Sequence, residues 1–224
     1  MILTVGGTKG GSGKSTLATN IAAWLAHEGK DFILVDTDGP QATSAKWVER
    51  RNDTRSRPID EGGIPDLPTV NCVQKTGNVY NALRDLEQRY GIVLVDAGGA
   101  DSQELRTAIT ASDCLYVPLR ASIFDLETLD KLEKIVSEVK DVLNPDISVF
   151  AVLSQAPANP SIKEAAEARE FIQPYPFLTL CENSVCDRTT YRLGVRDGRG
   201  AVEMSNGTAK AEIQLLCEEI FNHD

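Results

Sequence analysis

Short runs of apolar residues alternate along the chain with longer segments whose apolar positions recur every three or four residues. Runs such as 33–35 and 92–95 are apolar throughout, which is typical of parallel strands covered on both faces. These runs predict strands at 2–5, 32–36, 69–73, 92–96, 114–119, 147–153 and 177–180. The helical periodicity predicts helices at 15–28, 41–50, 78–90, 102–111, 125–143, 161–172, 187–193 and 207–222. This alternation indicates an α/β fold with a doubly wound, mostly parallel sheet flanked by helices.

Length and composition suit one globular domain. The chain has 224 residues, of which 42% are hydrophobic and 25% charged, enough for a full core over 1–224. Three prolines and a Gly-Gly pair within 52–68 predict a surface excursion. We expect no helix-turn-helix extension before the first strand. No apolar run approaches the ~18–20 residues that span a bilayer, and the first strand lacks the features of a signal peptide, so we expect a cytoplasmic protein.

The most informative motif follows the first apolar run. Residues 9–16 read Lys-Gly-Gly-Ser-Gly-Lys-Ser-Thr, between a predicted strand and a predicted helix, the context of a phosphate-binding loop. Glycines let the backbone curl around phosphates, and the exposed N–H groups and helix N-terminus favour anions. We expect Lys14 to reach the β- and γ-phosphates, Ser15 to ligate Mg²⁺ and Thr16 to contact the α-phosphate. The predicted nucleotide-binding residues are Lys9, Gly10, Gly11, Ser12, Gly13, Lys14, Ser15 and Thr16.

Two predicted strands end in aspartate, at the edge of the sheet where ligands bind. Asp96, followed by Ala-Gly-Gly, indicates a Walker B strand whose carboxylate holds Mg²⁺ through a water. Asp36 ends the second predicted strand and Asp38 follows two residues later, so the two side chains would share a face if the strand continued. We expect Asp36 to support the water shell of the metal and Asp38 to orient the attacking water. The predicted cofactors are therefore ATP and Mg²⁺, with Ser15, Asp36 and Asp96 around the metal.

Charge and cysteine content narrow the possible partners. The net charge of −10 disfavours bulk attraction to DNA or anionic lipid, yet the segments 188–199 and 46–57 each carry a local +3 by the sequence. We interpret the 46–57 cluster as solvated surface. The five cysteines are scattered without a Cys-x-x-Cys pair, which favours buried or idle thiols over a disulfide framework or zinc site.

Taken together, residues 9–16, the Val35–Asp38 segment with Pro40 and Gln41, and the Val95–Asp96 pair resemble the ParA/MinD family of deviant Walker ATPases. The small ParA type is closest, and the resemblance covers nearly the whole chain. It implies an ATP-dependent sandwich dimer in which Lys9 reaches the phosphates of the partner, so that Lys9, Lys14 and Asp38 are catalytic. It also implies non-specific DNA binding on the nucleoid and a ParB-like adaptor that stimulates hydrolysis, in plasmid partition. Gly39, inserted before Pro40, departs from the family pattern.

The predicted DNA contacts are four arginines and one lysine near the C-terminus: Arg188, Arg192, Arg196, Arg199 and Lys210. Segments 155–157 and 181–188 are candidates for adenine contacts. Several alternatives stay open: another cargo, such as a carboxysome or conjugation complex, or an ATP-dependent clamp or filament with incidental hydrolysis. MinD-like membrane binding is disfavoured because the C-terminal stripe 211–224 has four acids and no lysine or arginine. An iron–sulfur carrier would need paired cysteines, and a small-molecule ligase would not explain Lys9.

Overall fold

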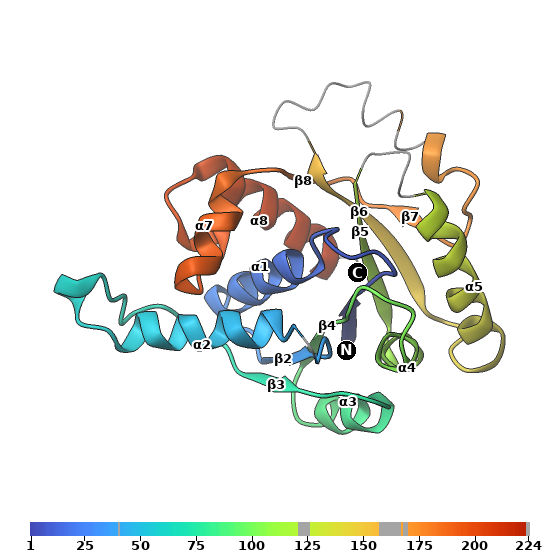
Figure 1. Ribbon diagram of the computed structural model, residues 1–224, viewed down its shortest axis with the longest axis horizontal. Helices are drawn as coiled ribbons and strands as arrows, with labels where there is room; N and C mark the ends of the chain where they lie inside the picture. The colour runs from blue at the N-terminus through green and yellow to red at the C-terminus, as the bar shows by residue number, and fades with distance from the viewer. Residues whose placement is uncertain (40, 121–125, 157–166, 168–169, 223–224) are drawn as a thin grey trace.

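The strands form one parallel sheet (Figure 1). The computed structural model describes residues 1–39, 41–120, 126–156, 167 and 170–222. Along the sheet the order is β3-β2-β4-β1-β5-β6-β7, and β8 pairs with β6. Every pairing is parallel, which confirms the predicted fold class. The strands are β1 Ile2–Val5, β2 Phe32–Asp36, β3 Cys72–Gln74, β4 Ile92–Asp96, β5 Cys114–Leu119, β6 Ser148–Ala156, β7 Thr179–Leu180 and β8 Val185–Cys186.

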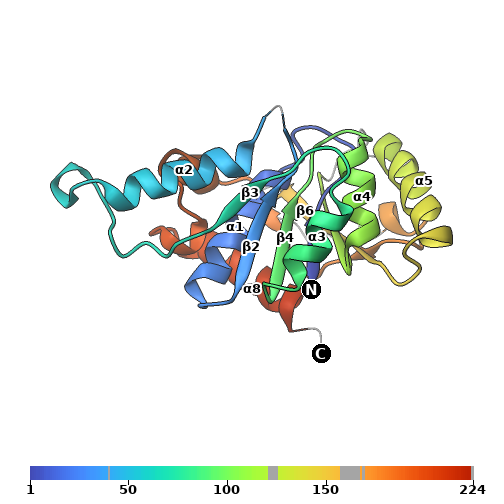
Figure 2. The same cartoon turned by 90° about the horizontal axis from the view of Figure 1, so that it is seen from below.

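Helices cover both faces of this sheet. One face carries α1 Lys14–His27, α2 Thr43–Ser56, α7 Thr189–Asp197 and α8 Gly207–Phe221, and the other carries α3 Tyr80–Glu87, α4 Gln103–Ala111 and α5 Leu126–Val142 (Figures 1 and 2). Two short 3₁₀ turns, η1 Ile59–Glu61 and η3 Ala201–Glu203, complete the described elements. The chain is therefore wound on both sides of the sheet, as the alternating pattern predicts.

Alternation of side chains explains why the central strands are apolar throughout. Leu34 of β2 and Leu94 of β4 pack into the core beneath α1 and α8. Their neighbours Ile33 and Val93 pack into the opposite core beneath α3 and α4. Since successive residues of a strand point to opposite faces, a sheet with two covered faces requires apolar residues at every position.

The largest difference from the predicted boundaries concerns α2. It runs to Ser56, beyond the predicted end at residue 50 and into the segment read as a surface excursion. Trp47, Arg51 and Thr54 are buried on its inner face, so part of the buried stripe is polar and the hydrophobic pattern underestimates the helix. Strand β8 was not predicted, and most of the predicted helix 161–172 lies outside the described residues.

Candidate nucleotide site

The glycine-rich loop joins β1 to α1 at the carboxyl end of the sheet. Gly11 and Gly13 have φ of 72° and 97°, left-handed values that favour glycine. Gly13 is the N-cap of α1, so the positive end of the helix adjoins the loop. The general motif would place a glycine five residues before Gly13, where this chain has Thr8. The loop therefore departs from the general pattern at its start and keeps its glycines next to the helix.

The end of β6 holds the loop from the other side. Ser154 donates its hydroxyl to the Ser12 carbonyl at 2.7 Å, and the Gln155 side-chain amide donates to the Gly11 carbonyl at 3.1 Å. Gln155 itself has φ of 52°, an uncommon value for a residue other than glycine. These two contacts turn loop carbonyls toward β6, which leaves the opposite edge of the loop for an anion. Nothing in the local sequence around 154–155 predicts this role.

Lys14 is folded into the site. Its side chain is largely covered, with the residue 7% exposed, and its Nζ donates to the Lys9 carbonyl at 2.5 Å. Burial lowers the pKa of Lys14, and the nearby carboxylates of Asp96 and Asp38 act in the opposite direction. A Cβ on Gly99 would come within 2.9 Å of Nζ. A glycine at position 99 therefore lets the loop after β4 approach the lysine closely.

Asp96 supplies a buried carboxylate beside this lysine. It is 1% exposed, its Oδ2 accepts the Ser44 hydroxyl at 2.6 Å, and its Oδ1 has no hydrogen-bond partner among the described residues. Burial raises the pKa of Asp96 to about 7, while the Ser44 and Ser15 hydroxyls lower it. An unsatisfied buried carboxylate oxygen near a serine hydroxyl suits Mg²⁺, which prefers oxygen ligands and keeps several waters. Ser15 and Asp96 therefore fit the metal that the sequence predicts.

Asp36 fastens the loop that follows β2. Its two carboxylate oxygens accept backbone N–H groups of Asp38 at 3.0 Å and of Ala45 at 2.9 Å. Burial raises the pKa of Asp36, and these backbone hydrogen bonds lower it. Asp36 therefore connects the start of α2 to the end of β2 through these two hydrogen bonds.

Asp38 lies in the loop and not on the strand, because β2 ends at Asp36. The expectation that the two aspartates share a strand face is therefore wrong. The backbone turns at Asp38, whose carbonyl accepts the Ala42 N–H at 2.7 Å. Its half-buried carboxylate lies 3.5 Å from an ideal Cβ on Gly98 and interacts with the charge of Lys14. Asp38 thus faces the phosphate end of the site.

Two cavities meet at the loop. The first, of about 440 Å³, adjoins Gly10, Lys14, Ser15, Asp38, Gln41 and Gly99. The second, of about 330 Å³, is lined by Asn20, Arg120, Cys186, Asp187, Arg188 and Tyr191, among others. Gly13, Thr16 and Gln155 line both. The two cavities are thus continuous along the loop, and Gln155 and residues 185–188 of the predicted adenine segments line the second one; Pro157 lies outside the described residues.

The predicted DNA-contacting residues separate into two groups. Arg192 and Arg196 lie exposed on α7, and Lys210 is exposed on α8. Arg188 instead donates to Glu212 through Nε and Nη2, at 2.9 and 2.6 Å, and lines the second cavity. Arg199 donates to Asp197 at 2.8 Å. The exposed residues on α7 and α8 are therefore Arg192, Arg196 and Lys210, although Arg192 also borders the second cavity that Arg188 lines.

The structure also bears on two other sequence interpretations. All five cysteines are free, and four of them are buried. Burial raises the pKa of Cys72 and of Cys114 to about 12, which agrees with idle thiols.

Within the described residues, no helix combines the length and apolar character needed to cross a membrane. Ser44, Ser154 and Asn20 are site residues that the sequence interpretation missed, because isolated serines and asparagines carry no local signal.

A glycine-rich loop between the first strand and the first helix, beside an acidic residue that ends the neighbouring parallel strand, defines the fold of P-loop nucleoside triphosphatases. Residues 1–153 match the family model of ATPase MipZ. The chain belongs to this family of ParA-type ATPases, which confirms the resemblance seen in its motifs.

Known relatives agree with this assignment. The chromosome partitioning protein ParA of Myxococcus xanthus is 28% identical over 180 residues, covering 68% of this chain and 63% of that protein. The chromosome-partitioning ATPase Soj of Thermus thermophilus is 34% identical over 164 residues, covering 65% of each. The match thus spans less than two thirds of either relative. The fold is also that of apo McdA from Cyanothece, with a TM-score of 0.77, 17% identity and 98% of both chains covered.

Proposed function

We propose that this chain is an Mg²⁺-dependent ATPase that closes into a dimer on ATP, binds DNA without sequence preference and is reset by a ParB-like adaptor to segregate plasmid DNA. The observation that carries the proposal is that the carboxylates of Asp38 and Asp96 both interact with Lys14, which lines the phosphate cavity together with Asp38. Phosphoryl transfer needs little more from a protein than positioning and charge. This cluster offers a cation for the phosphates, a free carboxylate oxygen for the metal and a second carboxylate at the open edge.

Each group then has a distinct task. Lys14 leaves the Lys9 carbonyl and contacts the β- and γ-phosphates, while the glycine N–H groups surround them. Ser15 and Asp96 hold Mg²⁺, which neutralises charge on the phosphates when it is bound, and Asp36 supports its water shell. Asp38 orients the attacking water and accepts its hydrogen bond. Thr16 contacts the α-phosphate at the start of α1.

The partner subunit would complete the site. Lys9 lies half-exposed at the rim of the loop, where it can reach the phosphates bound by a second copy and act like an arginine finger. Arg192, Arg196 and Lys210 are candidates for DNA phosphates, with smaller parts for Arg188 and Arg199. Such a dimer would reside in the cytoplasm on the nucleoid. The names of the relatives, which refer to chromosome partitioning, support a DNA cargo; the same machinery could position another cargo.

The test is ATP turnover and oligomeric state measured together. We expect Mg²⁺-dependent hydrolysis that DNA and adaptor stimulate, and a dimer by analytical ultracentrifugation with ATP but not with ADP. Lys14→Ala should abolish nucleotide binding, whereas Asp38→Ala should bind ATP and accumulate as dimer. A stable ATP dimer whose slow turnover ignores DNA and adaptor would instead indicate a structural clamp. A wild-type chain that stays monomeric with ATP would refute the dimer model.

A further inference from the structure

Two basic segments that are far apart in the sequence lie side by side. Helix α2 contains the 46–57 cluster, and α7 lies within the 188–199 cluster; the two helices pack against each other (Figures 1 and 2). Arg50 of α2 donates through Nη1 to the Val195 carbonyl of α7 at 3.2 Å, and Trp47 donates to the Arg199 carbonyl at 3.4 Å. The positive charges of both clusters thus belong to one region of the surface.

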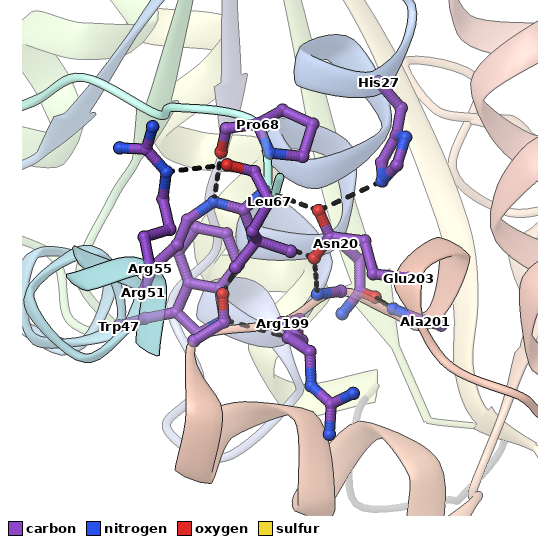
Figure 3. A network of polar contacts seen from close by, with 12 residues as sticks. Asn20, His27, Trp47, Arg51, Arg55, Leu67, Pro68, Arg199, Ala201 and Glu203 are labelled. Atoms are coloured by element: carbon purple, nitrogen blue, oxygen red, sulfur yellow. Dashed lines mark hydrogen bonds and ion pairs between the residues drawn. The ribbon is translucent and has the colours of Figure 1, made fainter. Parts of the chain in front are cut away.

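A buried ion pair joins α2 to η3, which follows α7 in the chain (Figure 3). Arg51, whose side chain is 0% exposed, donates to both carboxylate oxygens of Glu203 at 2.5 and 2.8 Å. It also donates to the carbonyls of Gly198 at 2.9 Å and Pro68 at 2.8 Å. Glu203 in turn accepts the Gly200 N–H at 2.8 Å. Because the Arg51 guanidinium is hydrogen-bonded to Glu203, Gly198 and Pro68, these contacts anchor α2 beside the end of α7.

The exposed cations repeat at the same spacing on both helices. Lys46 and Arg50 are four residues apart on α2, and Arg192 and Arg196 are four residues apart on α7. Residues at this spacing lie on one helix face, about 5–6 Å apart at Cβ. Arg192 pairs with Asp187, but both side chains are more than half exposed, at 66% and 57%, and such a pair contributes little. The acids Glu49 and Asp53 also lie on α2 beside Lys46 and Arg50.

We propose that Lys46 and Arg50 of α2 join Arg192 and Arg196 of α7 in a single surface, the α2–α7 surface, that contacts the phosphate backbone of DNA. The inference rests on the proposed DNA-binding function and extends its contacts to α2, whose charges the sequence alone indicates as solvated. Point charges spread over two helices suit a repeating polyanion better than a single small anion.

The location of α2 also links this surface to the nucleotide. The first turn of α2 carries Ser44 and Ala45, which bond Asp96 and Asp36 in the candidate site. Helix α2 therefore extends from the candidate nucleotide site to Lys46 and Arg50.

The experiment measures binding of a fluorescent random-sequence duplex to the ATP-bound protein over a range of salt concentrations. Lys46→Ala/Arg50→Ala should weaken binding and flatten the slope of log K against log salt by about 1 to 2. Lys131→Ala/Lys134→Ala removes the same charge from exposed positions on α5, across the sheet, and should change neither. Because Lys46 contacts the Gln41 carbonyl beside the phosphate cavity, Arg50→Ala alone is measured as well, and ATP affinity is measured for every variant.

The outcomes separate the two proposals. If Arg192→Ala/Arg196→Ala weakens binding while Arg50→Ala and the α2 pair do not, the α2–α7 surface is wrong and DNA binding by α7 stands. If the wild-type protein shows no ATP-dependent binding to DNA, the proposed function fails and the inference fails with it. Binding to phosphatidylserine vesicles in place of DNA would overturn the assignment of the polyanion.

Discussion

Ser44 of α2 donates its hydroxyl to Asp96 of β4 at 2.6 Å, within a fully buried pair. The contact joins the first turn of α2 to the strand end that would hold Mg²⁺. Because Asp36 accepts the backbone N–H groups of Asp38 and Ala45 at the same junction, the loop after β2, the start of α2 and the Asp96 carboxylate are connected by hydrogen bonds.

Removing this hydroxyl should weaken both the fold and its response to nucleotide. Ser44→Ala removes a hydrogen bond from the buried Asp96 carboxylate, which should lower the free energy of unfolding by about 1–3 kcal/mol. Urea denaturation of the nucleotide-free protein measures the loss. Ser44→Thr keeps the hydroxyl and serves as the matched control. Equal free energies of unfolding for the wild type and Ser44→Ala would show that this hydrogen bond does not stabilise the fold.

The raised pKa of Asp96 predicts how stability depends on pH. Burial raises the pKa of Asp96 to about 7 in the folded protein, from the ordinary value of 3.8, so the folded state binds a proton more tightly than the unfolded state. The free energy of unfolding should therefore fall as pH rises from about 4 to about 7, through this group. Asp96→Asn cannot lose a proton and should lack that component.

Urea unfolding of both proteins across this range, without nucleotide, checks the difference. The gap between Asp96→Asn and wild type should widen toward pH 8 in favour of the variant. The metal needs the ionised carboxylate, so Mg²⁺–ATP affinity of the wild type should increase over the same interval. Parallel pH profiles for the two proteins would contradict the assignment.

Lys9 and Lys14 are expected to fail in different ways. Lys9→Ala keeps the glycine N–H groups and Lys14, so ATP affinity should stay near that of the wild type. Loss of an arginine-finger-type contact should lower kcat by about 10³-fold or more. Filter binding and steady-state turnover measure the two quantities separately. Full turnover by Lys9→Ala would sink the model in which this lysine crosses to the partner subunit.

The buried Arg51–Glu203 pair should behave as a unit. Arg51→Met leaves the buried Glu203 carboxylate with only His27 and the Gly200 N–H as partners and should cost about 3 kcal/mol of stability, whereas Arg51→Met/Glu203→Leu should recover most of that loss. Thermal and urea unfolding of the single and double variants give the coupling energy. Additive losses in the double variant would mean that the two side chains do not stabilise the packing of α2 on the α7 segment through each other.

The sequence by itself determined the fold class, most strand positions and the phosphate loop, because these depend on local patterns. An apolar run reads as a buried strand, and glycines followed by Lys14 and Ser15 carry their chemistry within a few residues. The same locality placed Asp36 and Asp96 at the carboxyl edge of the sheet.

Only the tertiary structure decided which distant groups meet. Ser44 on Asp96, Ser154 on the loop carbonyl and Arg51 on Glu203 join residues separated by 52, 142 and 152 positions. Hydrogen bonds of this kind depend on where the packed helices bring polar atoms. The sequence around a single serine or arginine does not indicate which distant residue will be its partner. For the same reason, the charges on α2 read as solvated until packing placed them beside α7.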